Sequence, residues 1–500
     1  MPDLKDYFSR THAVPEHKPW SRFQLDEHGW NDMIHQLAVS DWTLLGLWAY
    51  GNEVYAAFRD VTIAVVSFEC RERRFKSLTE VRPAAARLER TIRDLFGLIP
   101  EGIADFRPWL DHGRWSQSQP LSNVHCGIPT GSIDYHFLST DGQNLHQIPV
   151  GPVHAGVIES GHFRFTCSGE TIVRLEERFG YKHRGIEGLI VGKNLIEASK
   201  IIGRISGDST VAYAIAFARA VEAATCTEVP PRAHWIRALM SELERISNHI
   251  FDFGAICNDV AFSFMLSKCM TIREQILQTN NICFGHRLLM DKIIPGGVTI
   301  DLTSEGVRVL SDLIKELRKQ ICKLADIYDN MPILQNRTIG TGIVKSALAH
   351  RFGAGGVVGR SSSQSCDARK NPGYPPYDDL NFDVPVHLEG DVNSRILQRI
   401  EEIQVSIGLI EQILKLIPDG SLFNQTKKCD GEGMALIESF RGEILLWIRL
   451  SKTGHVLRCH PRDPSWFQWP LLESAIEGNI VADFPVCNKS FNCSYSGVDL

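Results

Sequence analysis

The segment Pro230-Pro-Arg-Ala-His-Trp-Ile-Arg-Ala-Leu-Met-Ser-Glu-Leu-Glu-Arg-Ile-Ser-Asn-His-Ile-Phe-Asp-Phe253 decides the fold of the longer, C-terminal part of the chain. Its apolar residues recur every three or four positions, which is the spacing of one buried face of an α-helix. These residues are Trp235, Leu239, Leu243, Ile246, Ile250 and Phe253. Pro230 and Pro231 stand at the start, where a missing N–H costs a helix nothing. The segment therefore predicts a long helix packed on a core.

Beyond this segment, the same periodicity predicts two more long helices, over Val307–Tyr328 and Val392–Leu416. A strand-like pattern with a glycine turn occupies Pro152–Glu170. The segment Gly353–Asp391 is rich in Gly, Ser, Pro and Tyr, which is typical of a long ordered loop with a function. We expect this part to be a helical bundle with β decoration.

The first part of the chain has a different pattern. Val61–Phe68 is a β-branched run of strand length, and Val81–Phe96 has helical spacing. A stretch rich in Gly, Ser, Thr and Asp, Cys126–Asn144, indicates a linker. The predicted organisation is a small α/β domain over residues 1–125, a linker over 126–145, and a large, mainly helical domain over 146–500. The predicted fold class is α+β.

Composition limits the function classes. The 500 residues are 43% hydrophobic and 22% charged, which is typical of a folded protein of two or three domains. A net charge of -6 without basic stripes excludes nucleic acid as the expected partner. Thirteen cysteines without framework spacing favour reduced thiols in a cytosolic compartment. No window reaches the roughly 18 to 20 apolar residues of a membrane helix, so membrane association is expected through other subunits.

Ordered motifs connect the two predicted domains with a known family. Glu89–Gly97, Phe106–Leu110 and Trp115 resemble the 30-kDa subunit of respiratory complex I. The later motifs resemble its 49-kDa subunit and the large subunits of group 4 nickel-iron hydrogenases, namely hydrogenase-4 and formate hydrogenlyase. Those motifs are Gly151–Ala155, Glu159–Phe165, Tyr181–Glu187, Val229–His234, Glu244–His249, Ile294–Gly297, Gly359–Ser361, Pro376–Tyr377 and Asp383–Pro385. Fusion of the two parts in one chain is the arrangement found in hydrogenase-4 and formate hydrogenlyase.

The resemblance implies a nickel site whose ligands are replaced here. The family holds nickel with four cysteines from two C-x-x-C pairs, because nickel needs soft thiolate ligands in this site. At the matching positions this chain has Ser206, Ser209, Ser494 and Gly497. Cys493 is one residue out of register, and we expect it to be a small buried residue. We therefore predict no nickel-iron centre and no hydrogenase activity.

The resemblance to complex I implies quinone reduction as another activity. His154 matches the family's quinone-contacting histidine. The position of the family's quinone-contacting tyrosine falls at about Gly207, and Tyr213 lies further along the chain. Glu159 matches the glutamate that passes protons in group 4 hydrogenases, and Glu187 is a second relay candidate. A carboxylate whose pKa is raised by burial suits a relay near neutral pH; a solvated surface glutamate is the alternative.

Three further residues are implied to act near a cofactor. Arg204 and His249 align with an arginine and a histidine that approach the terminal iron-sulfur cluster of the neighbouring small subunit in complex I. Charged or titratable groups there tune the cluster's potential and couple its reduction to protonation. A structural histidine is the alternative for His249. Asp208 lies beside the replaced ligands and is expected to hydrogen-bond Arg204 or His154.

The chain has no iron-sulfur motif and no convincing dinucleotide fingerprint, so electrons are expected from clusters in a partner. The resemblance implies a hetero-oligomeric complex with an iron-sulfur small subunit and antiporter-like membrane subunits, at the cytoplasmic face of the inner membrane. The expected function is a large subunit of a complex I-like or hydrogenase-4-like oxidoreductase, active in electron transfer and proton coupling and linked to quinone. The alternative is a non-catalytic subunit that docks partner modules to the membrane arm.

Overall fold

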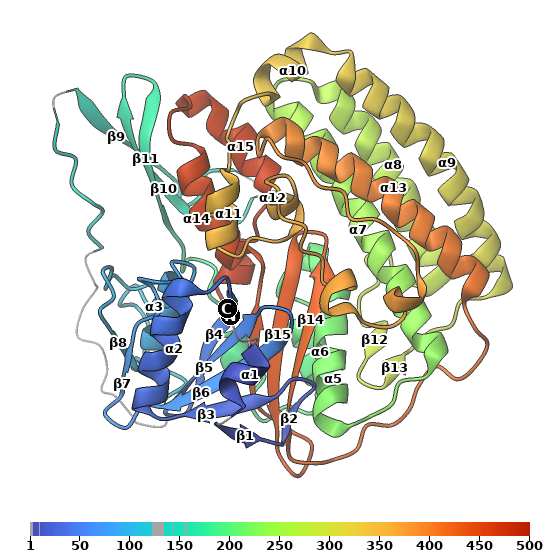
Figure 1. Ribbon diagram of the computed structural model, residues 1–500. Helices are drawn as coiled ribbons and strands as arrows, with labels where there is room; N and C mark the ends of the chain where they lie inside the picture. The colour runs from blue at the N-terminus through green and yellow to red at the C-terminus, as the bar shows by residue number, and fades with distance from the viewer. Residues whose placement is uncertain (1–3, 10, 123–134, 143, 156–157) are drawn as a thin grey trace.

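The computed structural model describes residues 4–9, 11–122, 135–142, 144–155 and 158–500 (Figure 1). Its first part contains α1 (Leu4–Phe8), β1 (His12–Val14), β2 (His17–Lys18), β3 (Arg22–Leu25), α2 (Glu27–Val39), β4 (Thr43–Tyr50), β5 (Glu53–Arg59), β6 (Ile63–Glu69), β7 (Arg74–Lys76), α3 (Ala85–Phe96) and β8 (Ile99–Glu101). A five-stranded sheet in the order β1-β3-β6-β5-β4 forms its centre. The predicted strand and helix over Val61–Phe68 and Val81–Phe96 are present as β6 and α3.

The second part begins with a three-stranded antiparallel sheet and continues into helices. Its first half contains β9 (Leu145–Val150), β10 (His162–Ser168), β11 (Thr171–Arg178), α4 (Ile186–Leu189), α5 (Leu195–Ile202), the helical turn η1 (Gly207–Ser209), α6 (Thr210–Thr225), α7 (Pro231–Asp259), α8 (Ser263–Phe284), β12 (Ile293–Ile294) and β13 (Gly297–Val298). Its second half contains α9 (Ser304–Asp329), α10 (Pro332–Thr338), α11 (Ser346–Arg351), α12 (Gly356–Arg360), α13 (Val392–Leu416), β14 (Gly431–Ser439), β15 (Gly442–Leu450), β16 (Val456–Arg462), α14 (Ser465–Ala475) and α15 (Phe484–Phe491).

The three long helices predicted from periodicity are confirmed as α7, α9 and α13. They pack side by side with α8 in the bundle seen in Figure 1. Trp235, Leu239 and Phe253 of α7 are buried, as the three-four spacing requires. The α+β fold class is also confirmed, because these helices occur with separate sheets in one chain.

The predicted linker over 126–145 lies largely outside the described residues, and the domain boundary there stays a prediction. Its described stretch, 135–142, has neither helix nor strand, and β9 begins at Leu145. The predicted loop Gly353–Asp391 is ordered. Within its described course it has only α12 and two short helical turns, and much of it is buried.

The N-terminal part is joined to the large part by a shared sheet. Strand β2 pairs in parallel with β14, so that a segment near residue 17 becomes the fourth strand of the sheet β16-β15-β14-β2. Figure 1 shows the blue N-terminal sheet beside the orange strands β14 and β15. A buried ion pair between Arg22 and Glu432, at 2.9 Å, crosses the same junction. The two parts therefore form one packed body.

Among the helices of the described residues, none has both the length and the apolar composition that a membrane span requires.

Candidate functional site

The four positions that the sequence predicts to match the family's nickel ligands come together in space. Ser206 precedes η1 at the start of α6, and Ser494 and Gly497 follow α15. The Ser494 hydroxyl donates to Ser206 Oγ at 3.3 Å, although the two residues are 288 positions apart. The Gly497 N–H donates to Ser494 Oγ at 3.0 Å. The two turns predicted to match the family's ligand-bearing turns are therefore adjacent, with hydroxyls at three of the four positions and a glycine at the fourth.

An ion pair joins the first of these turns to the turn between β14 and β15. Arg441, from the turn between β14 and β15, donates to both carboxylate oxygens of Asp208, at 2.8 and 2.5 Å. It also donates to Ser209 Oγ at 3.1 Å, and the Ser206 hydroxyl donates to Asp208 at 2.6 Å. Burial alone would raise the pKa of Asp208, but the Arg441 guanidinium holds it well below its usual range. The pair is therefore ionised at neutral pH.

The prediction that Asp208 forms a hydrogen bond with Arg204 or His154 is wrong. Asp208 bonds Arg441 rather than Arg204 or His154, because the fold brings the β14–β15 turn over η1. Arg204 instead pairs with Asp291 through two contacts at 2.5 and 2.7 Å, on the exposed side of the molecule. Arg204 therefore lies at the surface, whereas Asp208 is part of the cluster around the two turns.

The structure leaves no room for a side chain at Gly497. A Cβ atom there would lie 2.6 Å from Cγ of Asp463, far closer than such atoms approach one another. Asp463 is itself held by the Tyr213 hydroxyl, which donates to its carboxylate at 2.6 Å. Tyr213 is fully buried, so its phenol is committed to the core and does not face a ligand.

The residues present do not fit a nickel ion. Three hydroxyls and a glycine replace four thiolates, and a guanidinium cation lies among them. The thiol of Cys493 is buried and points to Gln468 Oε1 at 3.8 Å, which matches its predicted place as a small buried residue. Across the described residues, no group of three or more His, Cys, Asp or Glu side chains is arranged to hold a metal.

His154 and Glu159 both meet the C-terminal turn. His154 Nε2 lies 3.4 Å from the hydroxyl of Tyr495, and Glu159 accepts a hydrogen bond from the Ser496 N–H at 2.9 Å. Burial lowers the pKa of His154 and raises that of the Tyr495 phenol. Sequence reasoning missed Tyr495, although it lies between the replaced ligands Ser494 and Gly497. It supplies a phenol beside His154 that the Gly207 position lacks.

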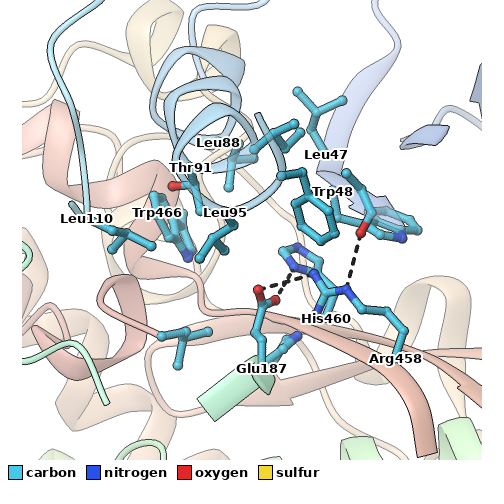
Figure 2. Close-up of a pocket in the computed structure, with 15 residues that line it drawn as sticks. Leu47, Trp48, Leu88, Thr91, Leu95, Leu110, Glu187, Arg458, His460 and Trp466 are labelled. Carbon is cyan, nitrogen blue, oxygen red and sulfur yellow. Dashed lines mark hydrogen bonds and ion pairs between the residues drawn. The ribbon is translucent and has the colours of Figure 1, made fainter. Parts of the chain in front are cut away.

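Glu187 lies in a different cluster, with Arg458 and His460 of β16. Its carboxylate accepts from His460 Nδ1 at 2.8 Å and from Arg458 at 3.1 Å (Figure 2). Burial alone would raise its pKa, but Arg458 and His460 lower it to about 2. This is the opposite of the raised pKa that a proton relay was expected to have, because the sequence did not show these two partners. The relay role of Glu187 stays a prediction.

His249 is buried in the core, away from Arg204. It bonds Glu402 at 2.9 Å, and Glu402 also accepts from Arg360 at 2.8 Å. Burial lowers the pKa of His249 despite this carboxylate. Its place inside a network of buried ion pairs favours the structural interpretation of this histidine.

The fold and the two facing turns define the class of hydrogenase-like large subunits. Three family models match the chain: "Respiratory-chain NADH dehydrogenase, 30 Kd subunit" over residues 23–125, "Nickel-dependent hydrogenase" over 184–258, and "Respiratory-chain NADH dehydrogenase, 49 Kd subunit" over 259–430 and 421–500.

Several curated proteins are similar over most of the chain. Hydrogenase-4 component G of Escherichia coli (strain K12) is 30% identical over 88% of this chain and 78% of its own. The carbon monoxide-induced hydrogenase of Rhodospirillum rubrum is 31% identical over 70% of this chain and 98% of its own. The C/D subunit of the NADH-quinone oxidoreductase of Phocaeicola vulgatus is 27% identical over 83% of this chain and 85% of its own. The chain belongs to the family of group 4 hydrogenase-like and complex I-like large subunits, with the 30-kDa and 49-kDa parts fused.

Proposed function

We propose that this chain is the large subunit of a membrane-associated, hetero-oligomeric oxidoreductase and takes part in electron transfer and proton coupling without a nickel-iron centre. The observation that carries the proposal is the meeting of the two ligand turns with Ser206, Ser209, Ser494 and an Asp208–Arg441 ion pair in place of thiolates. The scaffold of an electron-transferring subunit is retained, while its metal chemistry is replaced.

The proposed partners are an iron-sulfur small subunit and antiporter-like membrane subunits at the cytoplasmic face of the inner membrane. Exposed Arg204 supports a contact with the small subunit, because its guanidinium lies at the surface near the ligand turns. A relative named "Membrane-bound hydrogenase subunit alpha", of Pyrococcus furiosus, is 29% identical over 71% of this chain and 87% of its own. Electrons would enter this site from the partner's cluster.

The proposed acceptor is a quinone bound at His154 and Tyr495. Quinone reduction takes up two electrons and two protons, so its site needs donors beside the quinone oxygens. A neutral imidazole and a phenol at 3.4 Å supply such donors, and Glu159 accepts a hydrogen bond from the same C-terminal turn that carries Tyr495. Electrons would come from the partner's cluster, and protons through these side chains.

The test is quinone reduction by the purified intact complex, with ferredoxin, NADH or formate as donor. His154→Gln is expected to lower the rate by about 10²-fold or more, the usual range for loss of a proton-transferring group. His350→Gln is the matched control, because His350 is an exposed residue at the end of α11. An unchanged rate in His154→Gln would count against the quinone site, and one nickel per chain by elemental analysis would sink the proposal.

A structural subunit is the second candidate. The Asp208–Arg441 ion pair and the hydrogen bond from Tyr213 to Asp463 favour this function. Both interactions use polar side chains near the turns that a catalytic site would need for binding or proton transfer. Absence of turnover with every donor and acceptor pair, together with loss of assembly when the chain is deleted, would support this second function and contradict the first.

A further inference from the structure

A small cavity lies where the N-terminal part meets the large part. Its volume is about 20 Å³. Figure 2 shows Leu88, Thr91 and Leu95 of α3 on one side and the Glu187–His460–Arg458 cluster on the other. Trp466 of α14 also lines it. The cavity is therefore mainly apolar, with one charged wall.

In the part of the chain that the structure describes, three buried polar atoms of residues that line this cavity lack protein partners: His460 Nε2, Trp466 Nε1 and Trp48 Nε1. His460 Nδ1 lies 2.8 Å from the ionised carboxylate of Glu187, so it carries the proton and Nε2 is left as an acceptor. Within the described residues, His460 Nε2 and Trp466 Nε1 have no hydrogen-bond partner, although the two residues are only 7% and 3% exposed. Buried polar atoms in proteins are nearly always hydrogen-bonded, so these two indicate a ligand.

We propose that the cavity binds a single water molecule, which donates to His460 Nε2 and accepts from the Trp466 indole N–H. The polarity is complementary, because His460 Nε2 is an acceptor, the Trp466 indole N–H is a donor, and one water can satisfy both atoms. Its volume exceeds the roughly 10–15 Å³ that one water needs. An apolar occupant would leave both atoms unsatisfied.

The water completes a hydrogen-bonded chain from Trp466 through His460 to Glu187. His460 is held in place by its stacking on Trp48 of β4, with ring centroids 5.5 Å apart. The charged groups around it are Glu187 of α4 and Arg458 and Arg462 of β16, while the α3 residues on the cavity are uncharged. Burial lowers the pKa of His460, which keeps Nε2 an acceptor at neutral pH. The water site therefore fixes the orientation of the Glu187–His460 pair, whether or not the complex reduces quinone.

The first test is a crystal structure of the whole chain at a resolution that shows other buried waters. The expected result is one water within hydrogen-bond distance of both His460 Nε2 and Trp466 Nε1. An ordered map without density there, or with density bonded to neither atom, would overturn the inference. This result does not depend on any variant folding.

The second test uses ¹⁵N-histidine NMR in solution, with the His460 signal assigned by its loss in His460→Gln. Trp466→Phe removes the N–H and is expected to shift the Nε2 resonance of His460 toward that of an imidazole nitrogen without a hydrogen bond. Trp469→Phe is the control, because Trp469 lies on the same helix and its indole already donates to the Ser494 carbonyl at 3.1 Å. A His460 resonance that moves equally in both variants, or in neither, would contradict the water site.

Discussion

At the scale of single residues, an ion pair takes the place of a metal and its ligands. Arg441 is 6% exposed and would be a costly buried cation without Asp208. The hydrogen bond between Ser494 and Ser206 joins the two turns, and Arg441 ties both turns to the β14–β15 turn through Asp208 and the Asn492 carbonyl. Two substitutions test how much each contact matters.

Asp208→Asn should destabilise the protein by about 1–3 kcal/mol at pH 7, less than for a fully buried pair because Asp208 is about a third exposed. The pKa of Asp208 is depressed in the folded state, so its contribution is present above the unfolded pKa of about 3.9 and is lost as pH falls below it. Urea unfolding at several pH values measures this. The gap between wild type and variant should narrow at acidic pH, whereas exposed Asp312→Asn should change little; a constant gap would contradict the ion pair.

Gly497→Ala should destabilise the protein by about 1–3 kcal/mol, because the new Cβ would meet Asp463 at 2.6 Å. Gly207→Ala, in the other ligand turn, is the matched control, since no atom lies within 4 Å of its Cβ position. Thermal unfolding compares the two. Equal effects would show that Asp463 moves freely and that a side chain at position 497 is tolerated.

At the scale of elements, the spacing of apolar residues predicted the long helices, because each of them buries one face. The bounds predicted for α13 match the structure, because its apolar stripe spans the whole helix. Contacts between distant elements could not be predicted: Arg441 at Asp208, and Tyr495 at His154, come from separate turns and follow no spacing rule. The low pKa of Glu187 was missed for the same reason, since β16 supplies its partners.

One such contact between elements joins α7 to the N-terminus of α6. Glu244 accepts the N–H groups of Val211 and Ala212, at 2.7 and 3.1 Å, and burial raises its pKa to about 8. A raised folded pKa gives stability that is present below the unfolded pKa of about 4.3 and is lost as pH rises through about 8. Glu244→Gln should remove this dependence, so the melting temperature of wild type relative to the variant should fall from pH 5 to pH 8. Parallel curves would show that Glu244 is ionised in the fold.

At the scale of the whole molecule, the two fused parts share a sheet and a polar junction. Strand β2 extends the sheet of β14, and a cluster of Trp48, Tyr55 and Trp447 packs across the same boundary. Such a junction couples the parts, unlike two domains on a flexible linker. The large part should therefore unfold together with the N-terminal part.

The buried pair Arg22–Glu432 tests this coupling. Among the described residues, Arg22→Met leaves Glu432 with Arg449 as its remaining charged partner, at 2.8 Å and partly exposed. We therefore expect the free energy of unfolding to fall by about 3 kcal/mol, the lower end for a broken buried pair. The double variant Arg22→Met, Glu432→Met should lose less than the sum of the single losses, because it leaves no unpaired buried charge at either position. Denaturant unfolding, followed by tryptophan fluorescence and circular dichroism, measures both quantities. Coincident transitions that shift together would show one cooperative unit. Two separate transitions, with only the first shifted by Arg22→Met, would mean that the shared sheet does not couple the parts.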